Sequence, residues 1–167
     1  ILRGTGDHRM SVVADLGAVS IEEASRRLRG KEIRAIDLTE ACLDRIAETD
    51  AGVGSFLEIS ANVAREQAAA ADRRIAAGDA GPLTGIPIAL KDLFITRGVR
   101  TTCASKILKN FVPTFDGTLT ERLRAAGAVI VGKLNMDEFA MGSSNETSAY
   151  GNVVNPWDVF DVHGADA

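Results

Sequence analysis

Lys91 is the residue whose type and position best fit catalysis. It follows the apolar run Ile86-Pro-Ile-Ala-Leu90, which predicts a strand covered on both faces because it shows no polar alternation. A lysine at the end of such a strand is drawn toward the interior, where desolvation disfavours its charged form. A neutral lysine amine can take a proton from a serine hydroxyl, directly or through another serine. The sequence therefore predicts Lys91 as a general base at the end of a central strand, with its amine largely buried.

A purely structural role is the alternative for Lys91, namely a salt bridge at the strand end with Asp92. A lone lysine on an apolar strand is a weak signal, and this alternative stays open. A serine–histidine–aspartate triad is poorly supported, because the only histidines are His8 and His163 and neither lies in a motif.

A second candidate feature is the polar run Gly142-Ser-Ser-Asn-Glu-Thr-Ser148. Backbone amides of such a loop can line a substrate pocket, and an ordinary surface loop is the alternative. The run Gly132-Lys-Leu-Asn135 lacks the glycine spacing of a phosphate-binding loop, so we discount it. Cys42 and Cys103 match no zinc pattern, and we expect both to be buried as small hydrophobic residues in a reducing compartment.

The elements that must position these residues alternate between helix and strand. Ser20 and Glu23 form a capping box at a helix start, and Gly30 is the expected stop. The order of the elements predicts an α/β fold with layered helices and strands. Helices are expected at 20–30, 37–47, 62–77, 118–126 and, capped by Asn135, 135–140, and strands at 55–60, 88–92 and 128–131.

Composition excludes several classes of function. The 167 residues, 46% of them hydrophobic, suit one modest domain or a piece of a larger one. A net charge of -4 offers no basic face for direct binding of nucleic acid, so an RNA-linked role would need a partner or a small patch. The chain has no apolar run of membrane-spanning length and no secretion signal. We therefore expect a cytoplasmic protein.

The two ends of the chain differ from its body. Residues 1–9 are polar and aperiodic and precede Met10, so we interpret them as a non-native or upstream extension. Residues 10–158 are interpreted as the body of the domain. The tail 159–167 stops without a helix cap or a turn, and we regard it as atypical.

Several long motifs occur in the order typical of one family. The segment Gly85-Ile-Pro-Ile-Ala-Leu-Lys-Asp92 resembles the segment that carries the catalytic lysine of the amidase signature family. The resemblance runs from about Ile21 to Asp158, and it is greatest to the A subunits of tRNA amidotransferases. The other motifs that carry it are Thr101-Thr-Cys-Ala-Ser-Lys-Ile-Leu108, Asn110-Phe-Val-Pro113, Ala126-Gly-Ala-Val-Ile-Val-Gly-Lys133, Asn135-Met-Asp-Glu-Phe-Ala-Met-Gly-Ser-Ser144 and Asn155-Pro-Trp-Asp158.

This resemblance implies a fold and a mechanism. The fold would be the N-terminal part of a mixed central sheet covered by helices. The mechanism would be acyl transfer by a Ser-Ser-Lys triad, in which Lys91 is the lysine and a bridging serine connects it to the nucleophile. The substrate would be glutamine, which releases ammonia from its side-chain amide. Met141, Gly142 and Ser143 would border the substrate pocket, and no metal site is implied.

The resemblance also implies partners. The ammonia would reach a partner subunit that converts Glu-tRNA(Gln) to Gln-tRNA(Gln), as a carbon–nitrogen ligase of protein biosynthesis with B and C subunits. ATP and Mg would be bound by the partner, and this chain would need no cofactor.

The sequence departs from the family pattern after Asn155-Pro-Trp-Asp158. The family continues into Pro-Gly-Gly-Ser-Ser-Gly-Gly, which holds the bridging serine, whereas here, without a gap, the two serines of that motif fall on Asp166 and Ala167. The position of the nucleophilic serine is expected to lie beyond this chain. The tail is either foreign, as after a frameshift, or the gene is degraded. This chain therefore lacks both catalytic serines, and we expect it to be inactive alone. Two alternatives remain: another amidase-signature amide hydrolase, and a non-catalytic folding or interaction module.

Overall fold

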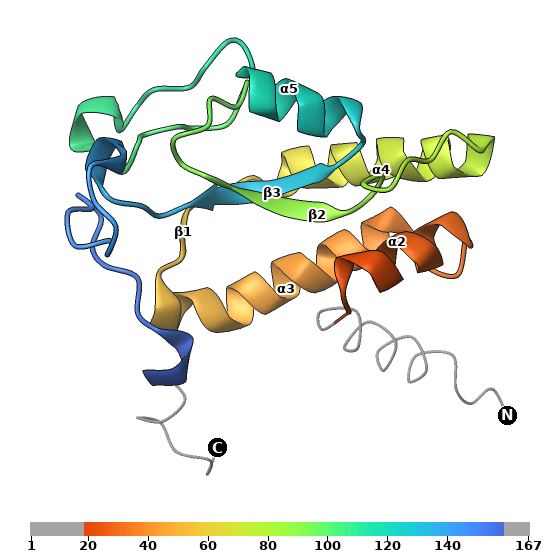
Figure 1. The fold of residues 1–167 in the computed structure, drawn as a ribbon, viewed down its shortest axis with the longest axis horizontal. Coiled ribbons are helices and arrows are strands. Elements are labelled where there is room, and N and C mark those ends of the chain that lie inside the picture. The colour runs from red at the N-terminus through yellow and green to blue at the C-terminus, as the bar shows by residue number, and fades with distance from the viewer. Residues whose placement is uncertain (1–18, 159–167) are drawn as a thin grey trace, which may run out of the picture. The chain divides into compact units, whose positions relative to one another are not determined.

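A computed structural model describes residues 19–158 (Figure 1). The helices and strands alternate, which confirms the expected α/β class. The extension 1–9 and the tail 159–167, with Asp166 and Ala167, lie outside the described residues. In chain order the elements are α2 (Ile21–Arg29), α3 (Ala35–Val53), β1 (Phe56–Ile59), α4 (Ala61–Ala77), β2 (Pro87–Lys91), η1 (Lys106–Leu108), α5 (Thr118–Ala125), β3 (Val129–Leu134) and η2 (Glu138–Ala140).

The described residues divide into two compact units. One comprises residues 19–45, 61–88 and 123–131, and the other comprises residues 46–60, 89–122 and 132–158. All candidate site residues that the structure describes belong to the second unit.

The three strands form a mixed sheet in the order β1–β3–β2. β1 is antiparallel to β3, with Ile59 opposite Gly132 and an irregularity between Phe56 and Glu58. Beside β3, the Val129 N–H donates to the Ile86 carbonyl at 2.9 Å, and the Asp92 N–H donates to the Leu134 carbonyl at 3.0 Å. From the first bond to the second, the residue numbers rise along both strands, so β2 and β3 are parallel.

The position of β2 in the sheet differs from the expectation. β3 is the central strand, and its first five residues are buried. β2 is an edge strand among the described residues, and only Leu90 in it is buried. The prediction that Lys91 ends a central strand is therefore wrong for the described part of the chain, because an apolar run indicates burial but not the number of neighbouring strands.

Helix α2 begins at the predicted N-cap, but only the Ser20 half of the expected capping box is formed, because the Glu23 carboxylate pairs with Arg26 and Arg27. The Ser20 hydroxyl accepts a hydrogen bond from the Glu23 N–H at 3.2 Å. At its end, the Glu32 N–H donates to the Arg27 carbonyl and the Lys31 N–H donates to the Leu28 carbonyl, which is a Schellman motif. The left-handed residue of that motif is Lys31, with φ 58°, rather than the expected Gly30.

Helix α3 is capped by a distant residue. The carboxylate of Asp72, in α4, accepts hydrogen bonds from the N–H groups of Ala35 at 2.6 Å and Ile36 at 3.3 Å. These bonds satisfy donors that a helix start leaves without partners. The helix therefore begins at Ala35, and the expected start at Asp37 is wrong because a local pattern cannot show a cap supplied from 36 or 37 residues away.

A glycine is required where the chain enters β2. Gly85 has φ +83°, and a Cβ built on it would lie 2.8 Å from the Cβ of Ala35. Only glycine adopts that φ readily and leaves room for α3. The Gly85 N–H donates to the Gly127 carbonyl at 2.8 Å. This contact holds the entry to β2 against the turn before β3.

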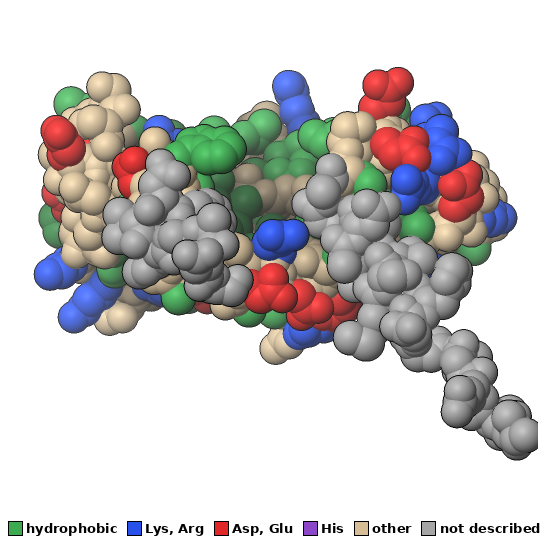
Figure 2. Space-filling view, turned by 90° about the horizontal axis from the view of Figure 1, so that it is seen from below, with side chains coloured by type: hydrophobic (Ala, Val, Ile, Leu, Met, Phe, Trp, Pro, Cys, Tyr) green, Lys and Arg blue, Asp and Glu red, His purple; other side chains and the backbone are tan. Residues whose placement is uncertain are grey.

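The surface carries charges of both signs. On the face drawn in Figure 2, acidic and basic side chains are intermixed and hydrophobic side chains also reach the surface. Within residues 19–158, the large hydrophobic side chains that are exposed include Ile107, Phe111, Val112, Phe115, Met141, Val154 and Trp157. None of the described helices is both long and apolar enough to cross a membrane.

Candidate functional site

Lys91 is the last residue of β2 and it is exposed. The prediction of a largely buried amine is therefore wrong for the described residues. The physical reason is that β2 is an edge strand, so that its end is open to solvent. The alternative salt bridge with Asp92 is not formed either, because the Asp92 carboxylate pairs with a different lysine.

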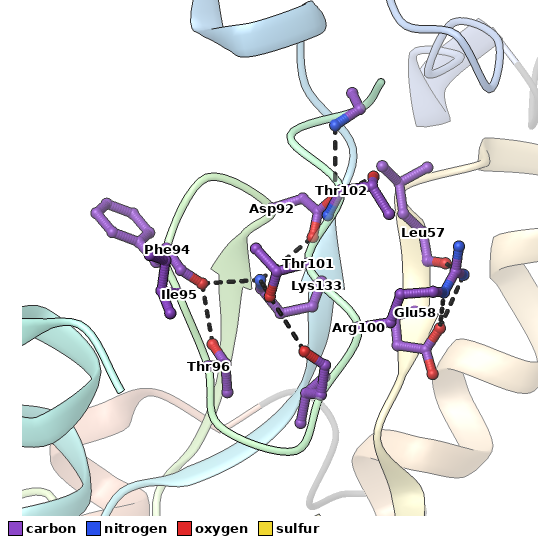
Figure 3. A network of polar contacts seen from close by, with 12 residues as sticks. Leu57, Glu58, Asp92, Phe94, Ile95, Thr96, Arg100, Thr101, Thr102 and Lys133 are labelled. Carbon is purple, nitrogen blue, oxygen red and sulfur yellow. Dashed lines mark hydrogen bonds and ion pairs between the residues drawn. The ribbon is translucent and has the colours of Figure 1, made fainter. Parts of the chain in front are cut away.

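That other lysine is Lys133, near the end of β3, which is fully buried at 0% exposure. Its Nζ donates hydrogen bonds of 2.8 Å to the Phe94 carbonyl and to Thr101 Oγ1, and lies 3.2 Å from Asp92 Oδ1 (Figure 3). The buried ammonium group, which has three donors, therefore makes two hydrogen bonds and one ion pair. Burial lowers the pKa of Lys133 below its usual range, and the Asp92 carboxylate opposes that shift.

Asp92 is itself buried, at 1% exposure, and it organises the turn that follows. Its Oδ2 accepts hydrogen bonds from the Thr102 N–H at 2.9 Å, the Thr102 hydroxyl at 2.5 Å and the Ala104 N–H at 3.4 Å. Its backbone carbonyl accepts from the Cys103 N–H at 3.2 Å. One aspartate therefore binds every residue from Thr102 to Ala104.

The turn contains two consecutive left-handed residues. Cys103 has φ 53° and Ala104 has φ 54°, a region that residues with a side chain seldom adopt. Such conformations persist only where the surrounding structure determines them. The hydrogen bonds to Asp92 hold both residues in the left-handed conformation.

A second ion pair holds the same loop to β1. Arg100 donates to the Leu57 carbonyl at 2.7 Å and to Glu58 Oε2 at 2.8 Å (Figure 3). Glu58 lies opposite Lys133 in the sheet register. Both ends of the polar network therefore rest on neighbouring strands of the second unit.

The loop after β3 is built around Asp137. Its carboxylate accepts hydrogen bonds from the Asn145 N–H at 2.9 Å, the Thr147 N–H at 3.0 Å and the Thr147 hydroxyl at 2.9 Å. These bonds hold the pKa of Asp137 below its usual range. A Cβ on Gly142 would lie 2.5 Å from Asp137 Cγ, so glycine is required there for the loop to close.

Asn135 is a second organiser of this loop. Its Oδ1 accepts from the Ser148 hydroxyl at 2.7 Å, and its Nδ2 donates to the carbonyls of Gly151 at 3.0 Å and Gly54 at 3.3 Å. The expectation that Asn135 caps a helix through Ala140 is wrong. The short helix there is η2, and the residue before it is Asp137. Asn135 does not cap it, because the Asn135 side chain is hydrogen-bonded to loop residues that are distant in the sequence.

Met141, Gly142 and Ser143 are all exposed on this loop. Within residues 19–158, no hydrogen bond or ion pair connects them to the Lys91 side chain. They are connected to the strand end indirectly, because the Phe139 N–H donates to the Cys103 carbonyl and the Ala149 N–H donates to the Ala104 carbonyl, both at 2.9 Å. The expected pocket-lining role of these three residues stays a prediction.

Sequence reasoning missed Lys133, Asp137 and the connecting role of Asp92. A signal for Lys133 was present, because it follows the apolar run Ala128–Val131 much as Lys91 follows its own run. Asp137 gave no comparable signal, since its partners lie eight and ten residues further along the chain.

The two cysteines and the possible metal ligands are the other candidates for reactive groups within residues 19–158. Cys42 and Cys103 are free and partly buried, and burial raises the pKa of both thiols. A thiol with a raised pKa is a poor nucleophile. In the part of the chain that the structure describes, no group of three histidine, cysteine, aspartate or glutamate side chains is arranged to hold a metal ion.

Comparison with known proteins gives consistent matches. The chain is 54% identical over 153 residues to the A subunit of glutamyl-tRNA(Gln) amidotransferase from Geobacter metallireducens, an alignment that covers 92% of this chain and 32% of that protein. Among solved structures, the A subunit of the Thermotoga maritima amidotransferase superposes with a TM-score of 0.64 at 35% identity, covering 87% of this chain and 29% of that one. The native peptide amidase of Stenotrophomonas maltophilia superposes with a TM-score of 0.75 at 33% identity, covering 84% and 30%.

These matches establish the family and the fold. The chain spans about a third of the length of the curated relatives that it matches. The superpositions confirm that the described residues adopt part of an amidase-type α/β fold with a mixed sheet, about 30% of the solved peptide amidase chain. The profile of the Amidase family matches residues 37–165, which is most of the sequence. The chain therefore belongs to the amidase family.

Proposed function

We propose that this chain is part of the A subunit of a glutamyl-tRNA(Gln) amidotransferase, which hydrolyses glutamine and supplies ammonia for the conversion of Glu-tRNA(Gln) to Gln-tRNA(Gln). The observation that carries the proposal is the high identity, over nearly the whole chain, to proteins of that name. The motifs around Lys91 and Met141 lie inside the matched region.

In the proposed mechanism Lys91 is the base of a Ser-Ser-Lys triad. The nucleophilic serine attacks the amide carbon of glutamine while its proton passes through the bridging serine to Lys91 Nζ. The proton then leaves with the amine, so that ammonia departs and an acyl-enzyme ester remains for water to hydrolyse. The Asp92 carboxylate pairs with Lys133, so Lys91 carries no ion pair with it. A neutral amine also requires that Lys91 be covered, and we propose that parts of the full-length protein outside residues 19–158 cover it.

The proposal includes the setting of the reaction. The chain would act in the cytoplasm within a complex with B and C subunits, which would receive the ammonia. The partner would bind ATP and Mg and the Glu-tRNA(Gln), and this chain would bind glutamine without a cofactor. Met141, Gly142 and Ser143 would border the glutamine pocket.

A second candidate is an amidase that acts on a free amide substrate. The superposition on peptide amidase is closer than that on the Thermotoga maritima amidotransferase chain, and this observation favours it. The sequence identity to the curated amidotransferase subunits favours the first candidate.

One experiment separates the two candidates. The chain is extended through the family serine motif to the full length of its relatives and purified with B and C subunits, and ammonia release is measured from glutamine and from a peptide amide. We expect release from glutamine and little from the peptide amide. The reverse preference would contradict the amidotransferase proposal and support the amidase.

The 167-residue chain alone serves as the matched reference. We expect no glutamine-dependent ammonia release from it, because Asp166 and Ala167 fall, without a gap, on the two serines of the family motif that holds the bridging serine. Release above the buffer level that survives replacement of Ser143 and Ser144 by alanine would show that the chemistry lies elsewhere, and release that Ser143→Ala alone abolished would move the nucleophile to this loop. Inactivity of both the short chain and the extended complex would favour the non-catalytic module.

A further inference from the structure

Two segments assigned to the proposed site are joined by one continuous set of hydrogen bonds. Asp92 directly follows Lys91, and its side chain and carbonyl bind Thr102, Cys103 and Ala104. The carbonyls of Cys103 and Ala104 in turn accept from the N–H groups of Phe139 and Ala149. The path therefore begins beside the proposed base and ends on either side of Met141–Ser143.

The centre of this path is strained and depends on Asp92. The left-handed conformations of Cys103 and Ala104 direct their carbonyls toward the loop that contains Phe139 and Ala149. Without an acceptor at Asp92 Oδ2, the N–H groups of Thr102 and Ala104 would lose their partner in a buried environment, where Thr102 and Ala104 are at most 1% exposed. A buried donor without a partner is costly, so the turn would rearrange.

Lys133 fixes the Asp92 carboxylate in place, because its Nζ lies 3.2 Å from Oδ1. Removal of one partner of a buried ion pair is strongly destabilising, so loss of Lys133 would disturb the carboxylate on which the turn depends. Lys133 Nζ contacts Oδ1, which leaves Oδ2 for Thr102 and Ala104. The two oxygens of one carboxylate thus have separate partners.

Stability alone does not explain a buried ion pair. Well-packed apolar residues of similar volume commonly replace such a pair without loss of stability. Here one carboxylate oxygen of Asp92 contacts Lys133 and the other holds the strained turn in place. Apolar residues could fill the same volume, but they could not hold the turn.

We propose that Asp92 and Lys133 are positioning residues, which fix the end of β2 at Lys91 relative to the loop that carries Met141–Ser143. Neither residue contacts the reacting atoms in this role. The inference rests on the proposed function of Lys91 and of that loop. It adds that Asp92 and Lys133 keep the proposed base and the proposed substrate loop in a fixed relative position.

The test uses the full-length protein with its partner subunits and three variants: Asp92→Leu, Lys133→Met and the double variant. Each single variant leaves a buried donor or charge without its partner, so it lowers both the thermal midpoint and kcat. The double variant removes both charges together, so the thermal midpoint returns part of the way to that of the wild type. The remaining loss reflects the N–H groups of Thr102 and Ala104, which still lack their acceptor. We expect kcat for ammonia release to stay about 10²-fold low, because a displacement of about 1 Å has an effect of that order.

A matched control pair is Glu58→Gln with Arg100→Met, which removes the neighbouring ion pair without touching Asp92. We expect this control to change kcat by much less than the Asp92–Lys133 double variant. Recovery of the wild-type kcat by that double variant, together with the thermal midpoint, would overturn the proposal and leave the pair a purely structural feature.

Amide hydrogen exchange keeps the test independent of activity. In the double variant we expect faster exchange at Thr102, Ala104, Phe139 and Ala149, with unchanged exchange at Val129 in β3. If the wild-type protein releases no ammonia, the proposed function fails, and exchange alone then decides the positioning role. Unchanged exchange at those four amides would overturn it.

Discussion

Lys91 and Lys133 stand near the ends of two parallel, adjacent strands, and each follows a run of apolar residues. Lys91 ends the edge strand β2 and is exposed. Lys133 lies in the central strand β3, and its amine has three oxygen partners and no exposure. The same local pattern therefore yields two opposite environments.

The difference comes from the sheet order rather than from the strands themselves. A strand with neighbours on both sides has its side chains buried near the strand end. A charged residue buried there needs an oppositely charged partner beside it. An edge strand has a neighbouring strand on one side only, so the side chain at its end stays accessible to solvent. Within the described residues, Lys133 is part of the buried architecture, whereas Lys91 is exposed to solvent.

The largest expected effect is on activity. In the full-length complex, Lys91→Ala should lower ammonia release from glutamine by about 10²–10⁴-fold, the usual contribution of a general base. Its thermal midpoint should stay near that of the wild type, because Lys91 is exposed and surface substitutions change stability little. Steady-state ammonia assays and thermal unfolding measure the two effects.

Lys109→Ala is the control, since Lys109 is another exposed lysine of the second unit. It should leave both activity and stability unchanged. Near-normal turnover of Lys91→Ala would remove Lys91 from the mechanism. The two lysines would then differ in burial but not in function.

The second effect is on stability. Lys133→Met leaves the buried Asp92 carboxylate without its counter-charge, and loss of one partner of a buried pair costs about 3–5 kcal/mol of unfolding free energy. Lys91→Met is the matched control, and it should change that free energy by no more than about 0.5 kcal/mol. Urea unfolding monitored at the single Trp157 and by circular dichroism measures both variants. Equal losses for the two variants would show that burial does not distinguish the two lysines.

A third expected effect concerns the open edge of β2. Among the described residues β2 has one strand neighbour, and an unpaired apolar edge recruits other chains. We expect the 167-residue chain to self-associate in sedimentation experiments. The strand β3 is similarly apolar, but it has neighbours on both sides and should not contribute. A clean monomer with a cooperative thermal transition would contradict this expectation.

The smallest expected effect is a pH dependence of the loop after β3. The folded pKa of Asp137 lies below its usual value, so its contribution to loop order is fully present above about pH 4 and is lost as the pH falls through the folded pKa. Amide exchange at Asn145 and Thr147 should therefore remain slow at pH 5 relative to intrinsic rates, and protection should disappear in stronger acid. Asp137→Asn should lose that protection at neutral pH, and a variant that kept it would show that the carboxylate does not organise the loop.

The fold was predictable where the signal is local. The Ser20 N-cap, the alanine-rich helix α4 and the apolar strand β3 follow from neighbouring residues alone, and the structure places all three close to the expected positions. Secondary structure of this kind depends on propensity and periodicity within one segment. The resemblance in the motifs around Lys91 and Asn135 supplied the family, which the comparisons confirm.

The site was less predictable because its contacts are distant in sequence. The cap of α3 comes from Asp72, the partner of Asp92 is Lys133, and the acceptor for Phe139 is Cys103. No periodicity marks such pairs. The edge position of β2 was missed for the same reason, because strand order is a property of the whole sheet.

Chemical labelling of the two lysines in one sample tests the central comparison most directly. The folded 167-residue chain is treated briefly with an amine-acylating reagent, and modification at Lys91, Lys109 and Lys133 is measured by mass spectrometry. The account predicts that Lys91 reacts about as fast as Lys109, whereas Lys133 stays unmodified until the chain is unfolded in denaturant. Equal labelling of Lys91 and Lys133 under folding conditions, or protection of Lys91 with labelling of Lys133, would contradict it.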